Sequence, residues 1–557
     1  MPYSIDRSRC LCCHNCALEC PVQAISYVGT GYSVDPEKCI DCGHCARVCN
    51  VDAARSDRPE PEAPKHETEH LSADVVVLGA GAAGIVAAAR AAQLIGGRVI
   101  LLEKAKKYGG SGWFAGFSAP AEDGGSVMPP MFEKAREKLI EGGIDPALML
   151  LAASTPVRFF SWLRELDPRV EQLWVLRPGR GGRMGYELAK REFFNLKCKD
   201  NAIGPGRSTS VMEKIVTDHF PELGVELLCS HRAVKILKDE SGAVSGVVAE
   251  NPGGLVEISC RAVISCTGGF AHNDELLRRY VPHFFGGAGD EPTHRFAAPT
   301  TTGDVVALGE SAGAFLDTDN FFANVFGPVH HPFSYCLFKF CCNGEVVNVN
   351  LNGERFMNES AFTSGAAKII HQPGRISWSI VDSDTRALIT ARLKGADSSG
   401  AMDVIDSDFE EEAALDTPVK KADTLAELAK KCGIAEEKLL DTVAKYNAAC
   451  ASGCDADFGK RPEDMRPIAN GPFYAIYGKV ATDGAFGGML VDGRLQVYNA
   501  DKSGVIPGLY AAGDNASGWA LRSKEPGDHR LMVCNECNWA ISSGFTAAEN
   551  AAEYLGK

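Results

Sequence analysis

Two copies of one cysteine spacing occupy the start of this chain. Each copy has three cysteines separated by two residues and a fourth shortly after them, at Cys10, Cys13, Cys16 and Cys20, and again at Cys39, Cys42, Cys45 and Cys49. In such a run, three thiolates bind one iron-sulfur cluster and the fourth thiolate binds the other cluster of the pair. We therefore predict two [4Fe-4S] clusters, held by a first quartet of Cys10, Cys13, Cys16 and Cys49 and a second quartet of Cys20, Cys39, Cys42 and Cys45. Structural zinc sites or disulfides are the alternative, which we disfavour because zinc ligands usually come as two pairs with a longer spacer.

The length and the charge of the chain limit what else it contains. At about 150 residues per domain, 557 residues correspond to three or four domains. The net charge of -15 argues against nucleic-acid binding, which depends on clustered Lys and Arg. The sequence shows no apolar leader and no run of about eighteen apolar residues, so we expect neither export nor a membrane span. With 21 cysteines, the protein is expected in a reducing cytoplasm, in an anaerobic host.

A polar segment and a glycine-rich turn follow the cysteines. Residues 53–73 hold three prolines and many charges, and we predict a linker there. Residues 74–78 form an apolar run typical of a buried parallel strand, which leads into a glycine pattern, a predicted helix at 82–95, and a second apolar run that ends in an acidic residue. This context predicts a dinucleotide site that uses Gly79, Gly81, Ala82, Ala83, Gly84 and Glu103, with the backbone close to a pyrophosphate and the carboxylate on a ribose. A purely structural turn is the alternative.

Further motifs indicate which dinucleotide is bound. Residues 104–116, 266–270, 302–304 with 312–314, 352–359 and 506–514 occur in the order and with the residues typical of one family. On these motifs, the chain resembles the flavoprotein superfamily of fumarate reductase and succinate dehydrogenase, and its first residues resemble bacterial ferredoxins with two clusters. The resemblance implies further FAD contacts from Lys104, Gly110, Ser111, Gly112, Ala115, Gly116, Thr267, Gly268, Gly269, Asp304, Gly513, Asp514 and Asn538. Because residues 110–113 contain no histidine, it implies FAD that is bound without a covalent link.

The resemblance also implies an architecture. We expect an α/β chain with a Rossmann-like parallel-sheet FAD-binding domain at residues 74–324 and 466–557, interrupted by an inserted α+β capping domain at 325–465. A small α+β ferredoxin-like domain at residues 1–52 should precede it, joined through the linker at 53–73. Residues 538–554 should form a terminal helix whose N-terminus points at the flavin.

The same family implies a chemistry. Its members pass a hydride between flavin N5 and one carbon of an activated C=C bond, while an acid, often an arginine, protonates the other carbon. By resemblance, Arg386 is the first candidate for this acid, and a surface arginine on a helix that begins at residue 382 or 383 is the alternative. Arg530 (or Arg522) and His331 (or His330) are candidates for substrate binding, with an ordinary loop histidine as the alternative for either His. The dicarboxylate clamp of soluble fumarate reductases is incomplete here, so we expect an enone, enoate or aromatic acrylate rather than fumarate itself.

We therefore interpret the sequence as an FAD and iron-sulfur reductase of a small-molecule alkene. The chain has one glycine fingerprint and no second one for a nicotinamide, so a ferredoxin or similar donor should supply the electrons. Three alternatives stay open: a ketosteroid-dehydrogenase-like enzyme that runs in reverse, an electron-transfer subunit of a larger complex, and adenylylsulfate reductase chemistry. The oligomeric state also stays open. A further cluster or thiol pair among Cys336, Cys341, Cys342, Cys534 and Cys537 is disfavoured, because free cysteine commonly fills a core.

Overall fold

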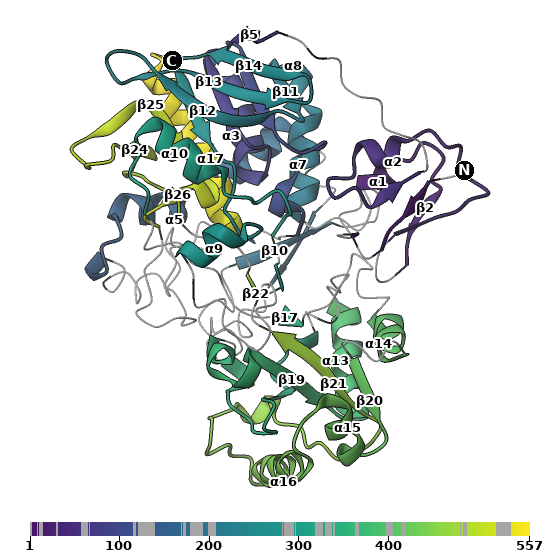
Figure 1. Ribbon diagram of the computed structural model, residues 1–557. Helices are drawn as coiled ribbons and strands as arrows, with labels where there is room; N and C mark the ends of the chain where they lie inside the picture. The colour runs from purple at the N-terminus through teal and green to yellow at the C-terminus, as the bar shows by residue number, and fades with distance from the viewer. Residues whose placement is uncertain are drawn as a thin grey trace.

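The computed structural model places three bodies in the chain. It describes residues 3–7, 9–10, 15–28, 32–56, 65, 67–114, 118–120, 137, 140–168, 170, 174–178, 193–198, 208–280, 282, 294–295, 297–317, 327–328, 337, 340–361, 367–396, 405–414, 419–479, 481–482, 487–519 and 536–557. In Figure 1 the N-terminal body (purple) and a second body (green) lie beside a larger α/β body that contains the C-terminal helix (yellow). The prediction of a mixed α/β chain with a parallel-sheet domain is confirmed.

The N-terminal body repeats one short pattern of strand, helix and strand. The first copy holds β1 (Ser4–Ile5), α1 (Asn15–Leu18) and β2 (Ile25–Tyr27), and the second holds β3 (Tyr32–Val34), α2 (His44–Arg47) and β4 (Ala54–Arg55). β1 pairs with β4 and β2 pairs with β3, both antiparallel. Its core consists of Tyr32, three alanines and cysteines, which is little apolar surface for a folded domain. So small a core makes the domain dependent on a bound group for stability.

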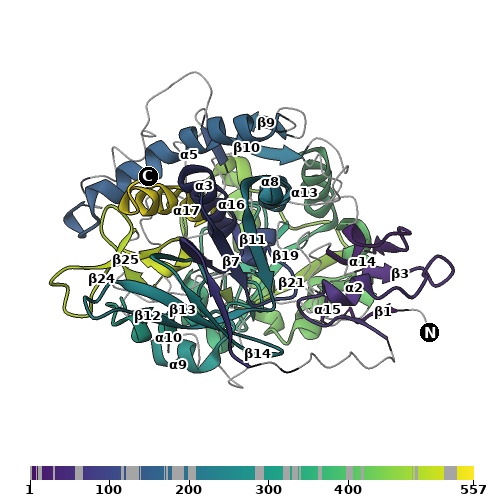
Figure 2. The same ribbon diagram turned by 90° about the horizontal axis from the view of Figure 1, so that it is seen from above.

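A six-stranded sheet forms the centre of the large body. Its order is β11 (Val225–Cys229), β7 (Val99–Glu103), β6 (Val75–Leu78), β15 (Ala262–Ser265), β25 (Val505–Ala511) and β24 (Gln496–Tyr498), and all neighbours are parallel except β24 and β25. The β6 and β15 side chains are all buried, as in a sheet covered on both faces. Helices α3 (Ala82–Ile95), α17 (Glu536–Tyr554), α7 (Ser208–Asp218) and α5 (Pro146–Leu166) pack in layers around it (Figure 2).

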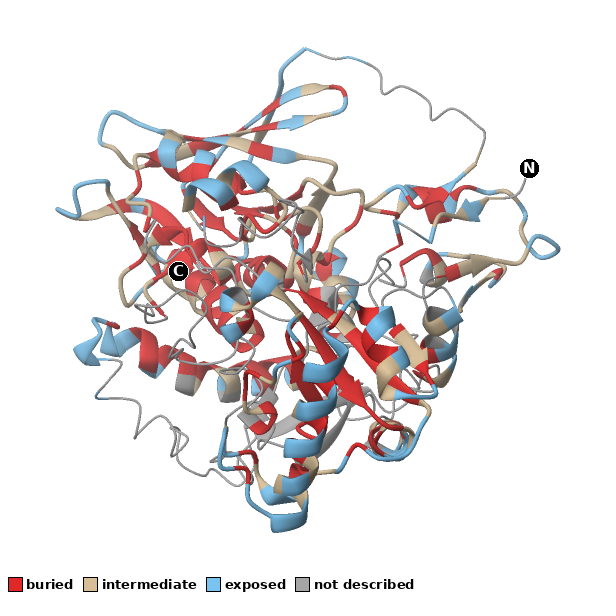
Figure 3. Cartoon of the chain, turned by 60° about the horizontal axis from the view of Figure 1, so that its bottom comes forward, coloured by how far each residue is buried: buried red, intermediate tan, exposed pale blue. Residues whose placement is uncertain are grey.

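One glycine allows the α3 and α17 helices to pack closely. A Cβ at Gly544 of α17 would lie 2.3 Å from the carbonyl oxygen of Ala83 in α3, which only glycine permits. The predicted terminal helix is therefore present and lies against the helix that follows the glycine turn. Buried residues gather in this helix pair and in the strands beneath it, as the red segments of Figure 3 show.

A second sheet includes part of the segment that was predicted to be a linker. It runs β12 (Arg232–Lys238), β13 (Val244–Asn251), β14 (Gly254–Ser259) and β5 (Glu69–Ser72). Both β4 and β5 lie within the predicted linker at residues 53–73, so at least these parts of that segment are strands. Strand β5 is mostly exposed and pairs in parallel with β14, far along the chain. Such pairing leaves no hydrophobic alternation for sequence reasoning to find.

The cap, as we call the body drawn in green, contains a five-stranded sheet. Its strands are β17 (Gly327–Pro328), β21 (Phe473–Lys479), β19 (Ile376–Val381), β18 (Val347–Val349) and β20 (Val419–Ala422), covered by α13 (Ser383–Ala396), α14 (Ile405–Ala414), α15 (Leu425–Cys432) and α16 (Glu436–Ser452). Strand β21 pairs with β17, β19 and β20, although it lies beyond the predicted boundary at residue 465. Its buried apolar run suits either body, so the sequence alone did not assign it.

Short elements complete the described chain. They are β8 (Ser118–Pro120), β9 (Trp174–Pro178), β10 (Phe193–Cys198), β16 (His294–Arg295), β22 (Ala481–Thr482), β23 (Met489–Leu490), β26 (Ala516–Ser517), α8 (Phe220–Leu223), α9 (Asp274–Tyr280), α10 (Asp304–Ala312), and the 3-10 turns η1 (Gly110–Phe114), η5 (Glu359–Ala361), η6 (Ala367–His371), η7 (Pro373–Arg375), η8 (Pro462–Asp464) and η9 (Gly513–Asn515). Within the described ranges, every helix is too short or too polar to cross a membrane.

Candidate functional site

The glycine turn between β6 and α3 has the geometry that a dinucleotide site requires. Gly79 adopts φ 92°, and a Cβ there would lie 2.6 Å from the carbonyl oxygen of Cys266. A Cβ at Gly84 would lie 1.8 Å from the Gly79 carbonyl oxygen, so this glycine brings the helix onto the strand end. Gly81 caps α3, and Ala82 and Ala83 begin the helix and are buried. The amide groups of this helix start are thus available to an anionic group.

Two carboxyl groups lie beside this turn. Glu103, at the end of β7, accepts hydrogen bonds from the amides of Ala80 and Ala105, both at 2.8 Å, and burial raises its pKa. Glu213 of α7 is fully buried, and both its oxygens lack a hydrogen-bond partner within the described residues. Burial raises the Glu213 pKa well above its usual value, and the nearby Glu103 adds to the effect.

The carboxyl group of Glu213 has no partner among the described residues, and at 0% exposure it is out of reach of a bound dinucleotide. The residues that fit a dinucleotide are the glycine turn, where a Cβ would clash, and Glu103, whose oxygens can accept hydrogen bonds from ribose hydroxyl groups. The sequence reasoning missed Glu213, although a single glutamate within the apolar pattern of residues 211–216 was a usable signal.

The predicted contact residues Lys104 and Asp304 bond to each other. Lys104 Nζ lies 2.7 Å from Asp304 Oδ2 and donates a second bond of 2.7 Å to the Thr302 hydroxyl. Arg232 donates two hydrogen bonds to the other oxygen of Asp304, at 2.8 and 3.1 Å. This ion cluster ties β7, β12 and the start of α10 together. The two predicted positions contact each other directly, and Arg232, which the sequence did not single out, joins them.

One asparagine, which follows the closing strand β25, forms hydrogen bonds with the end of β15 and the residues after it. Asn515 Oδ1 accepts bonds from the Thr267 amide at 2.8 Å and the Ser265 hydroxyl at 2.7 Å, and its Nδ2 donates to the Gly268 carbonyl at 2.7 Å. The neighbouring Asp514 is only partly exposed, and burial raises the pKa of its carboxyl group to about 6. The predicted positions Thr267, Gly268 and Asp514 are therefore held together.

The start of α17 and the second glycine loop join the same region. Trp539 Nε1 donates to the Gly513 carbonyl at 3.1 Å, next to the buried Asn538. In the second glycine loop, Gly109 forms a β-bridge with Gly81, Gly110 adopts φ 49°, and Gly112 is buried. The Ser111 hydroxyl of this loop accepts a hydrogen bond from the Ala298 amide at 3.0 Å. Near the start of α10, the Gly303 amide donates to the Gly269 carbonyl at 3.1 Å. Ala115 and Gly116 lie outside the described residues.

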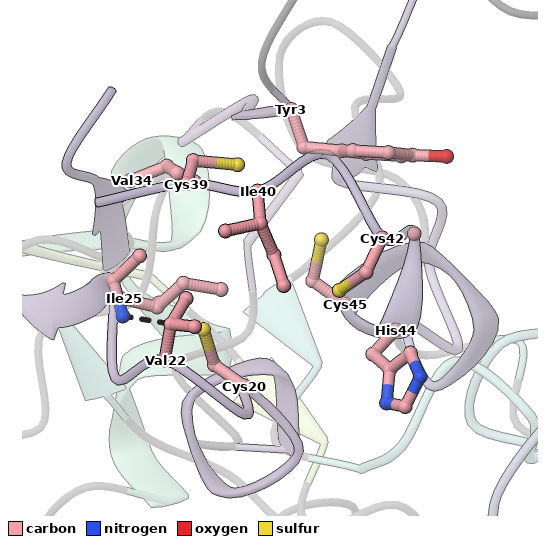
Figure 4. Close-up of a pocket in the computed structure, with 12 residues that line it drawn as sticks. Tyr3, Cys20, Val22, Ile25, Val34, Cys39, Ile40, Cys42, His44 and Cys45 are labelled. Atoms are coloured by element: carbon pink, nitrogen blue, oxygen red, sulfur yellow. Dashed lines mark hydrogen bonds between the residues drawn. The ribbon is translucent and has the colours of Figure 1, made fainter. Parts of the chain in front are cut away.

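The second cysteine quartet lines a cavity in the N-terminal body. Figure 4 shows Cys20, Cys39, Cys42 and Cys45 around it, among apolar side chains that include Ile40. The amide of Ala24 donates to the Cys20 sulfur at 3.2 Å. Burial, together with the neighbouring thiols, raises the pKa of Cys45 to about 11. Four thiols and an amide donor around an apolar cavity fit a [4Fe-4S] cluster.

The first quartet shows the same hydrogen bond at its fourth cysteine. The amide of Ala53 donates to the Cys49 sulfur at 3.1 Å, four residues along the chain as in the other copy. Cys10, Cys16 and Cys49 are buried, and Cys13 lies outside the described residues. Among described side chains, no three His, Cys, Asp or Glu groups are gathered tightly enough for a single metal ion.

The motif at residues 352–359 forms a buried ion network within the cap. Arg355 bonds to Glu359 at 2.7 Å and to Asp455 at 2.8 Å, and Lys460 Nζ lies 3.3 Å from Glu359. None of the four side chains is more than 6% exposed. Asn358 of the same motif donates to the Gly459 carbonyl at 2.8 Å. The contacts of this motif therefore lie inside the cap.

Arg386 has partners within the cap as well. Its guanidinium bonds to Asp406 at 3.1 Å and lies over the rings of Phe409 and Tyr474, with its side chain 16% exposed. Helix α13 begins at Ser383, as the alternative to a catalytic role anticipated. The Arg386 side chain is thus largely packed within the cap rather than on the surface, and its catalytic role stays a prediction. His331, Arg530, Cys336 and Cys534 lie outside the described residues, while Cys341 and Cys537 are buried.

Polar contacts join the N-terminal body to the second glycine loop. Asn50 Nδ2 donates to the Lys107 carbonyl and Asn50 Oδ1 accepts from the Lys107 amide, both at 3.1 Å. Lys107 Nζ also bonds to Glu19 at 2.8 Å, and Lys106 bonds to Asp52 at 2.9 Å. The cysteine-rich body is thus attached to the loop that the sequence assigned to the flavin.

Two family models match most of the chain. The model of the FAD binding domain matches residues 74–523, and that of the 4Fe-4S dicluster domain matches residues 2–50. The chain is 28% identical to a fumarate reductase (cytochrome) of Shewanella frigidimarina, over 90% of this chain and 81% of that one. It is 27% identical to a vinyl phenol reductase of Lactiplantibacillus plantarum, over 87% and 97%. A flavocytochrome c3 fumarate reductase in its open conformation shares the fold, with a TM-score of 0.63 at 24% identity over 87% of this chain and 79% of that one.

Proposed function

Since this chain belongs to the FAD binding domain family and also carries a 4Fe-4S dicluster domain, we propose that it reduces an activated C=C bond with electrons supplied through two [4Fe-4S] clusters. The observation that carries the proposal is the union of both sites in one chain, with Asn50 of the cysteine-rich body bonded to Lys107 of the flavin loop. The two relatives named above are reductases of fumarate and of vinyl phenols, which are both alkenes.

Bound FAD would supply hydride transfer to the substrate and one-electron exchange with the clusters. The residues of this chain hold it in place. The glycine turn at Gly79, Gly81 and Gly84 lets the backbone approach the pyrophosphate, and Glu103 accepts from ribose hydroxyl groups. Asp514 accepts from the ribityl chain. Because residues 110–113 offer no histidine, the FAD is held without a covalent bond.

The substrate in this proposal is an enoate, enone or aromatic acrylate rather than fumarate. Two carboxylates would call for a matched set of cations, and the sequence departs from that set near residues 483–486 and 530–538. The candidate cations Arg530 and His331 would meet a single activating group, where a positive charge stabilises the charge that develops on the substrate. The cap would cover the site and exclude water.

The electron donor in this proposal is a ferredoxin or a similar one-electron carrier in the cytoplasm. The chain has one glycine fingerprint for a dinucleotide, at residues 79–84, and the flavin occupies it. Each turnover consumes two electrons from two reduced carriers and two protons, and converts C=C to CH–CH.

An anaerobic reoxidation experiment tests the proposal. The purified protein is reduced with dithionite and mixed with a cinnamate-type acrylate, a simple enoate, a cyclic enone or fumarate. We expect the bleached flavin absorbance to return fastest with one of the first three, and mass spectrometry to show a product heavier by two hydrogens. If no alkene restores the absorbance, the proposed reaction is wrong. If a saturated compound instead bleaches the oxidised protein, the enzyme runs in the dehydrogenase direction.

A further inference from the structure

The two predicted clusters of the cysteine-rich body differ in their position along the route of the electrons. We propose that the first quartet (Cys10, Cys13, Cys16 and Cys49) is the inner cluster, which faces the flavin, and that the second quartet is the outer cluster, which receives electrons. Asn50 is the positioning residue that holds the inner cluster against the flavin loop. This inference rests on the proposed function and adds the route that electrons take within it.

The contacts of Asn50 give the inner end of the route. Asn50 directly follows Cys49, a ligand of the first quartet, and bonds in both directions with the main chain of Lys107. Three residues further along is Gly110 of the flavin loop, and Gly109 between them bridges to Gly81 of the glycine turn. The path from a cluster ligand to the flavin loop therefore crosses a single pair of hydrogen bonds, and the path to the glycine turn adds the bridge between Gly109 and Gly81.

A second contact lies on the same side of the junction. Asp52, which is also close to Cys49 in sequence, bonds to Lys106 at 2.9 Å. Glu19, which precedes Cys20 of the second quartet, bonds to Lys107 as well, but only with the end of the lysine side chain. The main-chain contacts are thus made beside Cys49, and the contact beside Cys20 is made at the far end of a long side chain.

Exposure gives the outer end of the route. The three described cysteines of the first quartet are buried, at 8 to 9% exposure. In the second quartet, Cys42 is exposed, and Ile40 beside it is 60% exposed on the rim of the same cavity. A carrier protein can approach a cluster closely only where a ligand reaches the surface, so the second quartet is the point of entry.

The sequence carries a trace of this specialisation. The first cysteine run ends in Cys20-Pro21, whereas the second run ends in Cys49-Asn50. Proline has no side-chain donor or acceptor, while the amide of asparagine has both. Of these two positions, the one with the asparagine is the one that contacts the main chain of Lys107. For each substrate, two electrons pass one at a time from two reduced low-potential carriers, through the outer and then the inner cluster, to the flavin site.

Asn50→Ala in the full-length, cofactor-loaded protein tests the junction. We expect the Lys107 amide to exchange its hydrogen roughly tenfold faster, because it loses its acceptor. Flavin bleaching after mixing with reduced ferredoxin should slow by roughly threefold or more, with iron and flavin contents and the KM for the carrier unchanged. Asn50→Asp keeps the acceptor for the Lys107 amide but loses the donor, so it should give a smaller effect.

Asn499→Ala is the matched control. Asn499 also uses its side chain to bond both ways, to Gly504 and Ser503, but in the β24–β25 hairpin. It should leave bleaching and Lys107 exchange unchanged. Equal bleaching rates in wild type and Asn50→Ala would overturn the inference, and so would unchanged Lys107 exchange. Failure of the proposed function would look different, because the wild-type flavin would then bleach with ferredoxin but transfer nothing to an alkene.

A soluble paramagnetic chelate tests the polarity. Added to the fully reduced protein, it should shorten the spin relaxation of one cluster signal much more than that of the other, because Cys42 of the second quartet is the exposed one among the described cysteines of the two quartets. Cys42→Asp, which offers a carboxylate ligand, should shift the signal that is sensitive to the chelate. Equal relaxation of both signals, or a shift of the protected signal, would contradict the assignment.

Discussion

The ion network inside the cap should respond to mutation in a non-additive way. Arg355 and Lys460 are its cations, and Glu359 and Asp455 its anions, so the buried group is neutral. Glu359→Gln leaves one uncompensated positive charge among side chains that are at most 6% exposed. Removal of one partner from a buried pair costs about 3–5 kcal/mol, so we expect that loss in the free energy of unfolding of the cap.

The double variant should recover part of this loss. Lys460→Met alone leaves one uncompensated negative charge, whereas Glu359→Gln with Lys460→Met leaves the neutral Arg355–Asp455 pair at 2.8 Å. We therefore expect the double variant to be more stable than the sum of the single losses by at least about 1 kcal/mol. Burial lowers the pKa of Lys460, and in Glu359→Gln it loses the anion that opposes this effect.

The pH dependence of the single variant follows from that pKa. A lysine whose pKa is lowered in the folded state destabilises that state below the unfolded pKa, because the unfolded chain holds the proton more tightly, and this penalty falls as the pH rises. The cost of Glu359→Gln should therefore be largest near pH 7 and shrink as the pH rises toward the unfolded lysine pKa of about 10.4.

Urea unfolding measured by hydrogen exchange of the β19 and β21 amides is the suitable assay, because it reports on the cap alone. Lys445→Met is the matched control, since Lys445 pairs with Asp441 on the surface at 68% and 52% exposure. It should change stability by less than about 0.5 kcal/mol. Strict additivity of the two single variants, or a loss in Glu359→Gln no larger than in the control, would refute the reasoning.

Three further outcomes are expected. Gly84→Ala should abolish FAD binding, because its Cβ would lie 1.8 Å from the Gly79 carbonyl, whereas Gly395→Ala, with open space around it, should leave the flavin content unchanged. Asp514→Asn should stabilise the FAD-free protein above about pH 6 but not below pH 4. The carboxyl group has a folded pKa of about 6 against an unfolded value near 3.9, so its ionisation destabilises the folded state above these values, and thermal melts at both pH values would show the difference. Arg386→Met should keep the rate of flavin reoxidation but lower the urea midpoint of the cap, and a lost rate with an unchanged midpoint would restore its catalytic role.

Sequence reasoning worked where structure is decided locally. The apolar run at residues 75–78, the glycines after it and the alanine-rich helix each constrain their own backbone, and the structure has β6 and α3 where they were expected. The two cysteine copies are equally local, and they fold into two matching strand–helix–strand units. The C-terminal helix was expected from the resemblance, and only its packing against Ala83 could place it in space.

Contacts between distant segments were the part that the sequence did not reveal. Strand β21 joined the cap, and polar strand β5 joined β14, because of pairing partners that no local pattern encodes. The hydrogen bonds of Asn515 and the burial of Glu213 likewise depend on neighbours far away in the chain. The resemblance gave Arg386 a role from its motif, but only the structure shows Asp406 beside it.

The junction at Asn50 explains why the cysteine-rich body belongs to the same chain. Its contacts are polar and few, and interfaces of that kind are weak between separate proteins. A covalent connection raises the effective concentration of one body near the other, so weak contacts suffice to keep them together. The Lys106–Asp52 pair is partly exposed and is screened by salt, whereas the hydrogen bonds of Asn50 to the Lys107 main chain carry no net charge. Transfer across the junction should therefore change little with ionic strength, while the encounter with a charged carrier at the exposed Cys42 should change strongly, and the two steps can be separated by salt alone.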